Sequence, residues 1–450
     1  MADHLKDRRP GGPTRRAMLA GATAGLGLLA MAGGAAAQVR LDITKGVVEP
    51  IPIAVSPFAG EDVGTRDIGR AVADVIAANL ESSGLFRVID RRAYIQDPES
   101  LRETPRFAEW RPINAQALVT GVVSRPAADR LVIEFRLWDV FSGSQLRGLR
   151  YELAADGWRR VAHQISDVTY ERLTGESGYF DTRIVYVSES GPRTQRVKRL
   201  AVMDQDGHNH RFLSDGGQLV LTPQIAPDGR RVAYFVLRTP VPQIMMLDLA
   251  TGRSAPLGEF PGMSFTPRFA PDGSVLLLTV ARDGNSDIFS FDTATRRTTQ
   301  LTQSPAIDTS PSFSPRGDRI VFNSDRGGTP QLYTMNRDGS NVQRISFGTG
   351  RYGSPAWSPR GDLIAFTKIQ GGYFHIGIME PDGANERLLT RSFLDESPAW
   401  APNGRIIVFT REDPRTDRSR LMTIDITGYN ERELPTPLDA SDPAWSGLIP

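Results

Sequence analysis

The 450-residue sequence contains no cysteine, and that absence excludes several classes of protein together. A chain without cysteine has no disulfides, no thiolate zinc site and no thiol nucleophile. Histidine is also scarce, with five in the chain, and the Gly-x-Ser-x-Gly pattern of serine hydrolases does not occur. The sequence therefore presents no set of catalytic residues. We expect a protein that is not an enzyme and that carries no cofactor and no metal.

Neither sign of charge is in excess, which argues against a role in binding nucleic acid. The chain has 53 Lys and Arg residues and 52 Asp and Glu residues. Residues 1–37 hold five of the basic and two of the acidic residues, so 48 basic and 50 acidic side chains lie beyond them. Because nucleic-acid binding requires a basic surface, we expect no nucleic acid among the partners.

The N-terminal segment has the pattern of an export signal. Thr14-Arg-Arg-Ala-Met-Leu19 fits a twin-arginine signal, and an uncharged, Gly/Ala-rich stretch follows it up to Val39. The alternative is an ordinary secretory signal that carries two arginines by chance. We expect removal of residues 1–37 by cleavage between Ala37 and Gln38, which leaves a soluble protein of a bacterial periplasm without direct membrane insertion.

The most informative feature that is present is a repeat of about 44 residues. A Pro-x-aromatic strand (with Ile in place of the aromatic in the first copy) recurs, and a Pro-x-Gly turn follows it in every copy but the last. The prolines are separated by 44, 44, 44, 43 and 45 residues: Pro223, Pro267, Pro311, Pro355, Pro398 and Pro443. A strand-rich repeat of this length is typical of a β-propeller with one four-stranded sheet per repeat.

The phase of the repeat predicts how the ring closes. Tight hairpins such as Asp206-Gly207 alternate with the Pro-x-aromatic strands; the first hairpin precedes the first such strand, and the last strand follows the last hairpin. We therefore expect Pro443–Ser446 to pair with Thr182–Val187 and to close a six-bladed propeller over residues 182–450. In one repeat Arg296 replaces the hairpin glycine, so we expect a turn of a different construction there.

Residues 38–173 lack the repeat and read as an N-terminal α/β domain. Five strands are expected, at Pro52–Ser56, Phe86–Ile89, Ala117–Val123, Leu131–Val140 and Gln145–Tyr151. Thr65 or Asp67 is expected to cap a helix that ends at Gly84, and Asp156 to cap a second helix. Residues 174–181 are expected to form a hinge to the propeller.

The segments that lead into the inner strands are the candidate binding site, because six such segments converge at one mouth of the central channel. They combine apolar and aromatic side chains with a polar rim, which suits the docking of a protein loop. The alternative is that they are polar loops without a binding role. The candidate residues are Met263, Phe265, Thr266, Asp308, Thr309, Arg351, Tyr352, Asp395 and Glu396.

Two other patterns have less specific interpretations. His208-Asn-His210 allows a metal hypothesis, but the equivalent residues of other repeats are solvent positions of a turn, and Asp204 and Asp206 lack the spacing of a calcium loop. The repeat aromatics are either a ligand platform or, as we favour, core residues wedged between neighbouring sheets: Phe269, Phe313, Trp357, Trp400 and Trp445.

The propeller repeat, the entry strand Gly178–Val187 and the preceding α/β domain together resemble the TolB family over residues 38–450. This resemblance implies a monomeric, non-enzymatic periplasmic adaptor of the Tol–Pal system, which supports outer-membrane integrity and constriction at cell division. It further implies that the channel mouth binds the lipoprotein Pal and that the mature N-terminus binds TolA. In such a system colicins and phage are further possible partners. The implied TolA-binding residues are Val39, Arg40, Leu41, Asp42 and Ile43.

Alternatives remain open at the level of the residues. The apolar alternation of Val39, Leu41 and Ile43 suits either an edge strand of the first domain or a strand that adds to a partner's sheet. A propeller that gates or escorts a peptidase for periplasmic peptides is the alternative function. A propeller that binds a small molecule or sugar is a further one.

Overall fold

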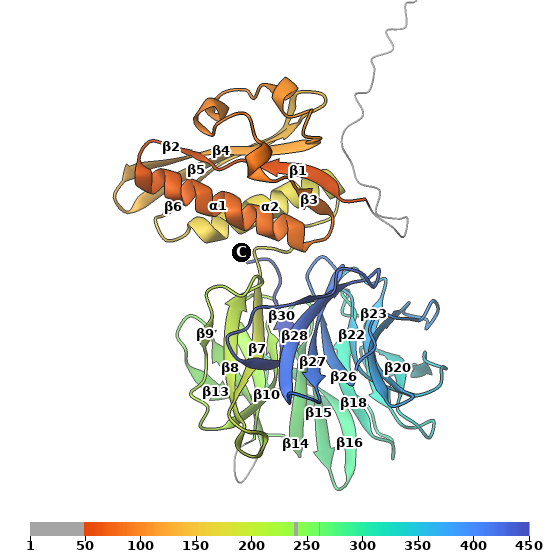
Figure 1. Cartoon of the computed structure of the whole chain (residues 1–450). Coiled ribbons are helices and arrows are strands. Elements are labelled where there is room, and N and C mark those ends of the chain that lie inside the picture. Colours follow the sequence, from red (N-terminus) through yellow and green to blue (C-terminus); the bar gives the residue numbers. More distant parts are fainter. Residues whose placement is uncertain (1–48, 238–241, 261, 450) are drawn as a thin grey trace, which may run out of the picture. The chain divides into compact units, whose positions relative to one another are not determined.

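The computed structural model describes residues 49–237, 242–260 and 262–449. The expected signal peptide, its cleavage site at Ala37 and Gln38, and the segment Val39–Ile43 lie outside these ranges. Within them, the chain forms an N-terminal α/β domain followed by a six-bladed β-propeller, as predicted (Figure 1). None of the helices in these ranges combines the length and apolar character needed to cross a bilayer.

The α/β domain is built on one mixed sheet. Its strand order is β3 (Phe86–Val88), β1 (Ile51–Val55), β4 (Ala117–Ala127), β5 (Arg130–Asp139) and β6 (Ser144–Ala154), with β2 (Ala59–Gly60) paired to β4. β1 runs parallel to both neighbours, whereas β4, β5 and β6 are antiparallel. The five predicted strands are thus present, most of them with slightly different ends.

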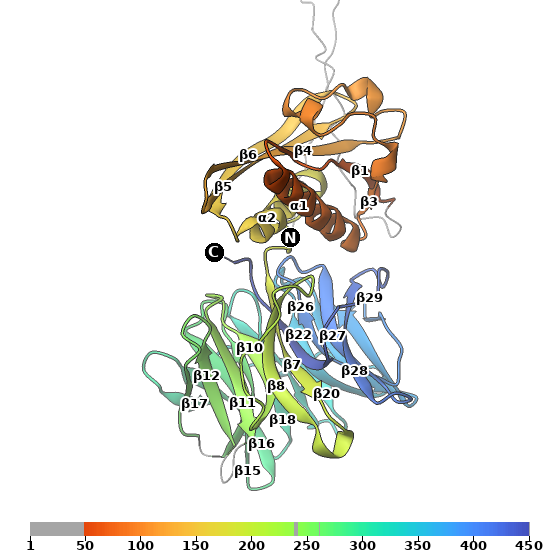
Figure 2. The same ribbon diagram turned by 60° about the vertical axis from the view of Figure 1, so that its left-hand side comes forward.

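Two helices, α1 (Val63–Ser82) and α2 (Trp158–Thr174), cover one face of this sheet in the described part of the chain (Figures 1 and 2). Side chains such as Val72 and Ile76 of α1 and Ile165 of α2 share one buried cluster with the inward residues of the strands. On the other side of the sheet, three short 3-10 helices, η1 (Arg91–Ala93), η2 (Glu99–Arg102) and η3 (Phe107–Glu109), enclose a second cluster around the indole of Trp110.

The helix starts differ from the predicted ones. Asp62 caps α1 in a capping box, in which its carboxylate accepts from the Thr65 N–H at 2.7 Å and Thr65 Oγ1 accepts from the Asp62 N–H at 3.0 Å. Thr65 therefore completes the cap from the third helical position, and Asp67 takes no part. The N-cap residue of α2 is Gly157, and no described side chain caps this helix. The prediction of Asp156 as the cap of α2 was therefore wrong.

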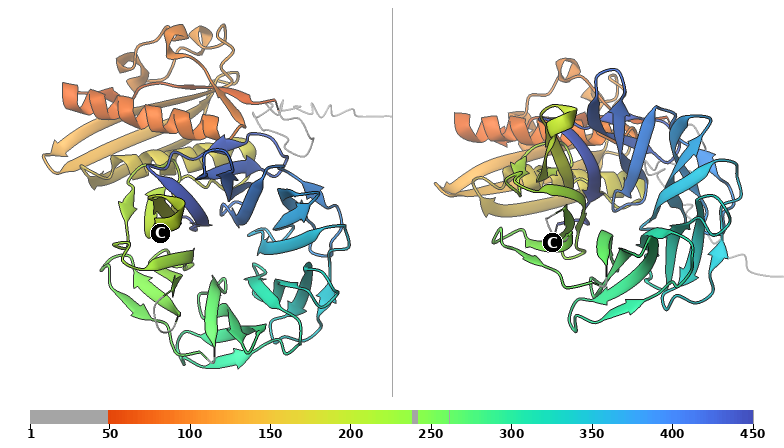
Figure 3. Two further views of the ribbon diagram at one scale, coloured as in Figure 1. Left: turned by 60° about the horizontal axis from the view of Figure 1, so that its bottom comes forward. Right: turned by 90° about the horizontal axis from the view of Figure 1, so that it is seen from below.

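The described residues after α2 form six four-stranded antiparallel sheets arranged in a ring (Figure 3). Three strands of the first sheet follow α2 directly: β7 (Arg183–Ser190), β8 (Val197–Asp204) and β9 (Arg211–Phe212). The 3-10 helix η4 (Arg193–Gln195) lies between β7 and β8, and the inner strand of this sheet comes from the end of the chain. The next two sheets are β10 (Leu219–Ile225), β11 (Arg231–Leu237), β12 (Gln243–Asp248) and β13 (Ser254–Pro256), then β14 (Met263–Phe269), β15 (Val275–Arg282), β16 (Asn285–Asp292) and β17 (Thr298–Gln300).

The remaining sheets repeat the same order. They are β18 (Asp308–Phe313), β19 (Arg319–Ser324), β20 (Gln331–Asn336) and β21 (Gln343–Arg344); β22 (Arg351–Trp357), β23 (Ile364–Gln370), β24 (Tyr373–Met379) and β25 (Arg387–Leu388); and β26 (Leu394–Trp400), β27 (Ile406–Asp413), β28 (Arg418–Asp425) and β29 (Arg432–Glu433). The first strand of each sheet contacts the first strand of the next sheet, so these strands form the inner wall of the ring.

The ring closes as the repeat phase predicted. The last strand, β30 (Asp439–Trp445), pairs antiparallel with β7, and the register places Ser441 opposite Val187 and Trp445 opposite Ile184. We call the sheet β30-β7-β8-β9 the closing blade. Because β30 occupies the inner position, the free edge of β7 is paired in the same way as in the other sheets.

The repeat aromatics lie between neighbouring sheets. Phe313 shares a buried cluster with Leu277 and Ile288 of the preceding sheet, and Trp400 does the same with Ile376. These contacts confirm the prediction of core residues for the aromatic position of the repeat. Each aromatic joins two sheets and thereby fixes the angle at which they meet.

The turn at Arg296 corrects a prediction. Its backbone has a left-handed φ of 60°, and its N–H donates to the Asp292 carbonyl at 2.9 Å. Gly252, with a φ of 68°, makes the equivalent bond to Asp248 at 2.9 Å, so the two turns are built alike. The Arg296 guanidinium donates to the Leu257 carbonyl at 2.7 Å, which offsets part of the cost of the left-handed backbone.

Candidate functional site

All six inner strands carry the same backbone distortion directly before the repeat proline. The residue there is not glycine, yet its φ lies between 45° and 55° in Thr222, Thr266, Ser310, Ser354, Ser397 and Asp442. The strand register shifts at the same place in each sheet. Backbone strain of this kind costs about 1–3 kcal/mol per residue and is typical of functional sites. We call the ends of the inner strands that lead into these residues the propeller mouth.

Polar side chains at the propeller mouth bond from one sheet to the next. Asp442 of β30 accepts from the Thr222 N–H at 3.1 Å and from the Ser397 hydroxyl at 3.4 Å. Its own N–H donates to Thr410 Oγ1 at 3.0 Å. The Ser310 N–H likewise reaches Thr279 Oγ1 in the preceding sheet at 3.2 Å. These bonds hold the distorted residues in place across the sheet boundaries.

The predicted mouth residues divide into two groups by burial. The side chain of Met263 is 42% exposed, and Arg351 is exposed as well. Phe265, Thr266, Thr309 and Glu396 are half-buried. These six side chains are at least partly exposed, and they comprise two apolar residues, two hydroxyls, one cation and one acid.

The other three predicted residues, Asp308, Tyr352 and Asp395, are buried and already paired within the chain. Arg326 donates to both carboxylate oxygens of Asp308, at 3.1 and 2.8 Å, and Arg411 does so to Asp395, at 2.7 and 2.8 Å. The hydrogen bonds to Asp395 raise the pKa of Arg411 above its usual value. Arg411 uses two guanidinium nitrogens for Asp395, whereas a single nitrogen of Arg326 serves both oxygens of Asp308. These charged pairs hold the strand ends in place, so they support the accessible residues instead of contacting a partner.

Tyr352 is held by a charged pair. Its hydroxyl donates to Glu386 at 2.8 Å, and Lys368 donates to the other oxygen of Glu386 at 2.6 Å. The Lys368 ammonium also lies 4.7 Å from the centre of the Tyr352 ring. Burial raises the pKa of the Tyr352 hydroxyl above its ordinary value.

An acidic pocket of about 430 Å³ lies at the propeller mouth where β26, β30 and β7 meet. Its lining includes five acidic and three basic side chains: Glu189, Glu396, Glu412, Asp417 and Asp442, with Arg193, Arg196 and Lys198. Burial, with Asp442 and Glu412 adding to it, raises the pKa of Glu396 to about 7. Glu396 therefore changes its charge close to neutral pH.

Of the charged residues of this pocket, only Glu396 was among the candidates predicted from the sequence. Glu189 lies near the end of β7, the strand that β30 joins, and Lys198, which lies 2.8 Å from it, lies near the start of β8. Both come from the closing blade, where the repeat motif is interrupted, so no position in the pattern pointed to them. Ring closure alone would have placed them beside Asp442.

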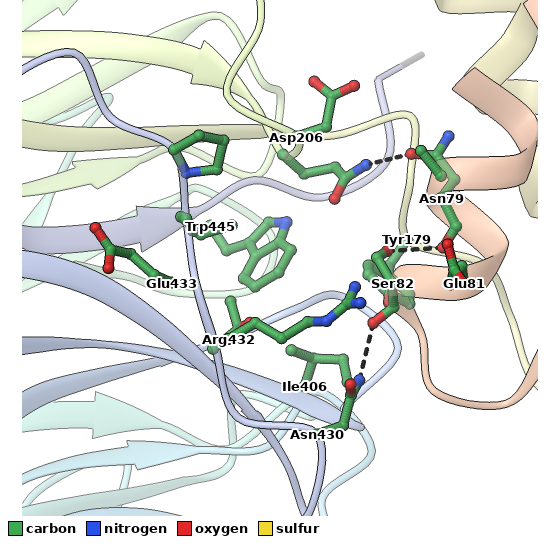
Figure 4. Close-up of a pocket in the computed structure, with 15 residues that line it drawn as sticks. Asn79, Glu81, Ser82, Tyr179, Asp206, Ile406, Asn430, Arg432, Glu433 and Trp445 are labelled. Carbon is green, nitrogen blue, oxygen red and sulfur yellow. Dashed lines mark hydrogen bonds between the residues drawn. The ribbon is translucent and has the colours of Figure 1, made fainter. Parts of the chain in front are cut away.

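A second pocket, of about 310 Å³, lies between α1 and the propeller (Figure 4). Gln205 Nε2 donates to Asn79 Oδ1 at 2.9 Å, and Asn430 Nδ2 donates to the Ser82 carbonyl at 2.8 Å. The indole of Trp445 contributes an apolar wall. This pocket could not be predicted from the sequence, because segments far apart along the chain form it.

The histidines of the first hairpin do not form a joint site. The ring of His208 is exposed, and that of His210 packs edge-on against Phe212 with 4.9 Å between ring centres. The two acids beside them, Asp204 and Asp206, instead approach His163 of α2. No sequence spacing linked α2 to this hairpin.

Comparison with known proteins identifies the family. The model of the TolB amino-terminal domain matches residues 39–146, and that of the TolB β-propeller domain matches residues 170–449. The Tol-Pal system protein TolB of Paramagnetospirillum magneticum is 63% identical over 421 residues, which cover 92% of this chain and 94% of that protein. The crystal structure of TolB from Acinetobacter baumannii superimposes with a TM-score of 0.79 at 28% identity, over 91% of this chain and 100% of that one. The chain therefore belongs to the TolB family, a non-enzymatic family of cell-envelope proteins that are components of the Tol–Pal system.

Proposed function

We propose that this protein is a periplasmic adaptor that binds the lipoprotein Pal at the propeller mouth. Membership of the TolB family and the chemistry of the mouth support this proposal. Exposed Met263 and half-buried Phe265 supply an apolar centre, while Arg351 and Glu396 supply charge at its edge. A centre of this kind with a polar rim is the usual composition of a protein-binding surface.

The rigidity of the residues that support the propeller mouth is the observation that most favours the proposal. Asp308 and Asp395 are each held by hydrogen bonds from an arginine, and the neighbouring residues have a strained backbone that bonds across the sheets. A surface that is held in place before binding loses little conformational freedom when a partner docks. The propeller mouth is in this sense prepared for a protein loop.

We assign binding of TolA to the mature N-terminal segment, Val39–Ile43. Its alternating apolar side chains suit a strand that adds to a partner's sheet, where backbone hydrogen bonds provide affinity. With one partner on the propeller and another on the N-terminal segment, a monomer would connect the two membranes of the envelope. This connection would support outer-membrane integrity and constriction at cell division, and colicins or phage could exploit the same surfaces.

Calorimetric titration with a soluble Pal domain tests the first part. We expect saturable binding that is weakened at least tenfold by Met263→Ala or Thr309→Ala, since truncation of a central contact costs about 2 kcal/mol and about 1.4 kcal/mol corresponds to tenfold. Val342→Ala is the matched control. Val342 is 37% exposed, close to the 42% of Met263, but lies in the hairpin after β20, at the opposite end of its sheet. No binding by the folded protein, or equal losses in all three variants, would overturn the mouth as the Pal site.

Deletion of Gln38–Ile43 tests the second part. The shortened protein should lose TolA binding and keep the circular dichroism spectrum of the full protein. Its affinity for Pal should also change if the two sites are coupled, and should stay the same if they are independent. Retained TolA binding would place that site elsewhere.

A further inference from the structure

Three potential metal ligands meet where α2 faces the closing blade. They are His163 of α2, Asp204 at the end of β8 and Asp206 in the hairpin that follows. His163 Nε2 lies 4.0 Å from Asp204 Oδ2 and 3.8 Å from Asp206 Oδ2. One ligand atom from each residue fits within 4.8 Å of the other two.

The imidazole of His163 is the unusual member of this group. It is 2% exposed, and its Nε2 has no hydrogen-bond partner although it points at the two carboxylates. A buried nitrogen without a partner is destabilising unless something binds it.

The other ring nitrogen is held by a polar chain of the kind that orients metal-binding histidines. His163 Nδ1 lies 2.9 Å from the carboxamide of Asn79, which also bonds to Ser166 at 3.0 Å and to Gln205 at 2.9 Å. A carboxamide can present either its oxygen or its nitrogen to the ring. In the structure Asn79 Nδ2 lies against His163 Nδ1, and Asn79 Oδ1 accepts from Gln205 Nε2. When both carboxamides are turned by 180°, their mutual hydrogen bond is kept, the Asn79 oxygen accepts from Nδ1–H and the lone pair of Nε2 is free for an ion.

The two carboxylates are oriented as well. Asn209 donates to Asp204 Oδ2 at 2.6 Å, and the His208 N–H donates to Asp206 Oδ1 at 3.2 Å. Arg159 of α2 also binds Asp206 and neutralises one of the two negative charges. The remaining negative charge, two oxygens and one imidazole nitrogen suit a divalent ion that accepts mixed ligands.

The distances favour a small ion. Ligands about 2.0–2.2 Å from a tetrahedral centre are roughly 3.4 Å apart, so the observed 3.8 and 4.0 Å require the side chains to close by about half an ångström. An imidazole is a good ligand for Zn²⁺, whereas Ca²⁺ and Mg²⁺ prefer oxygen alone. Three protein ligands leave the fourth position of such a site to water.

We propose that His163, Asp204 and Asp206 bind a divalent first-row metal ion, with Zn²⁺ the best fit, and that the ion fastens α2 to the closing blade. The ion would bridge the α/β domain and the propeller through direct bonds. The function of this site is structural, and it does not depend on the binding of Pal or TolA.

Calorimetric titration of the untagged full-length chain with Zn²⁺, after treatment with a chelator, tests the proposal. We expect one ion per chain, with affinity lowered at least about 100-fold in Asp204→Asn and in His163→Gln. Asp215→Asn is the matched control, because Asp215 is an exposed acid in the loop after β9 and lies outside the cluster. It should bind like the unchanged protein.

A second measurement separates loss of a ligand from loss of the fold. Co²⁺ in place of Zn²⁺ should give the visible absorption of a four-coordinate site in the unchanged protein and in Asp215→Asn, and Asp204→Asn should lack it while keeping the native circular dichroism spectrum. If His163→Gln fails to fold, Asp204→Asn alone decides. Absence of saturable binding by the folded protein would overturn the proposal, as would equal affinity in Asp204→Asn.

Discussion

Replacing Glu396 by glutamine should make the stability of the propeller less sensitive to pH. Burial raises the pKa of this carboxyl from 4.5 to about 7, with Asp442 and Glu412 adding to the effect. The folded protein therefore holds a proton that the unfolded chain releases at lower pH. The associated stability is fully present below pH 4.5 and is lost as the pH rises through about 7.

The size of the effect follows from the two pKa values. A change from 4.5 to about 7 corresponds to roughly 3 kcal/mol in the free energy of unfolding. This figure is an upper value, because the pocket around Glu396 is open to solvent and Lys198 lies on its wall. Glutamine keeps the shape of the side chain and removes its titration.

The assay is urea unfolding, followed by tryptophan fluorescence, at pH 4.5 and pH 8. The free energy of unfolding of Glu396→Gln, minus that of the unchanged protein, should rise by roughly 2–3 kcal/mol from pH 4.5 to pH 8. Glu259→Gln is the control, because Glu259 is an exposed glutamate of the same propeller. A stability difference between Glu396→Gln and the unchanged protein that stays constant from pH 4.5 to pH 8 would refute the reasoning.

Three further predictions concern stability measured by urea unfolding. Arg411→Met leaves the fully buried Asp395 carboxylate without its partner and should lower the free energy of unfolding by about 3–5 kcal/mol. Arg150→Met removes an exposed ion pair and should lower it by less than about 1 kcal/mol. Equal losses in the two variants would contradict the buried pairing. Arg296→Val should destabilise by about 2–3 kcal/mol, whereas Arg296→Gly should be nearly neutral, because glycine adopts the left-handed φ without strain. Burial lowers the pKa of His163, so the free energy of unfolding should fall as the pH drops below 6.5. His163→Gln should remove this part of the acid sensitivity, and a pH dependence of stability that is the same in both proteins would contradict the prediction.

Local chemistry explains why the propeller could be predicted from the sequence. A proline fixes one backbone angle and a glycine supplies a positive φ, so the repeat of Pro223 to Pro443 marks each inner strand and its turn without reference to distant contacts. The order of the hairpins and strands then predicted that β30 completes the closing blade. Arg296 misled the analysis because an arginine can adopt the left-handed conformation when the rest of the turn is favourable.

The accessible residues of the mouth could be predicted only in part. Asp308 and Thr309 are neighbours in the sequence, but consecutive residues of a strand point to opposite faces, so one is buried and the other is not. The register shift before the proline decides which, and its position is a property of the folded sheet. The arginine that pairs with Asp308 comes from the loop after β19, which has no repeat signal.

His163 shows a second limit of sequence analysis. A single histidine on the apolar face of a helix is ordinarily a core residue, and nothing near it in the sequence suggests a ligand. Its two carboxylate neighbours belong to a hairpin of the closing blade, where the backbone of Asp204 takes part in the turn. Only the packing of α2 against that hairpin brings the three side chains together.

Closure of the ring by β30 also sets the order in which the molecule can be assembled. Ser441 pairs with Val187 across about 250 residues, whereas a neighbouring pair such as Glu396 and Thr410 spans 14. By loop-closure entropy the longer connection costs roughly 2.5 kcal/mol more, and it forms only when the other sheets have brought its ends together. The closing blade is therefore the last to be completed when the chain folds. A chain interrupted before residue 439 would leave β7 as an open edge with unpaired backbone N–H and C=O groups, which chaperones and proteases can recognise.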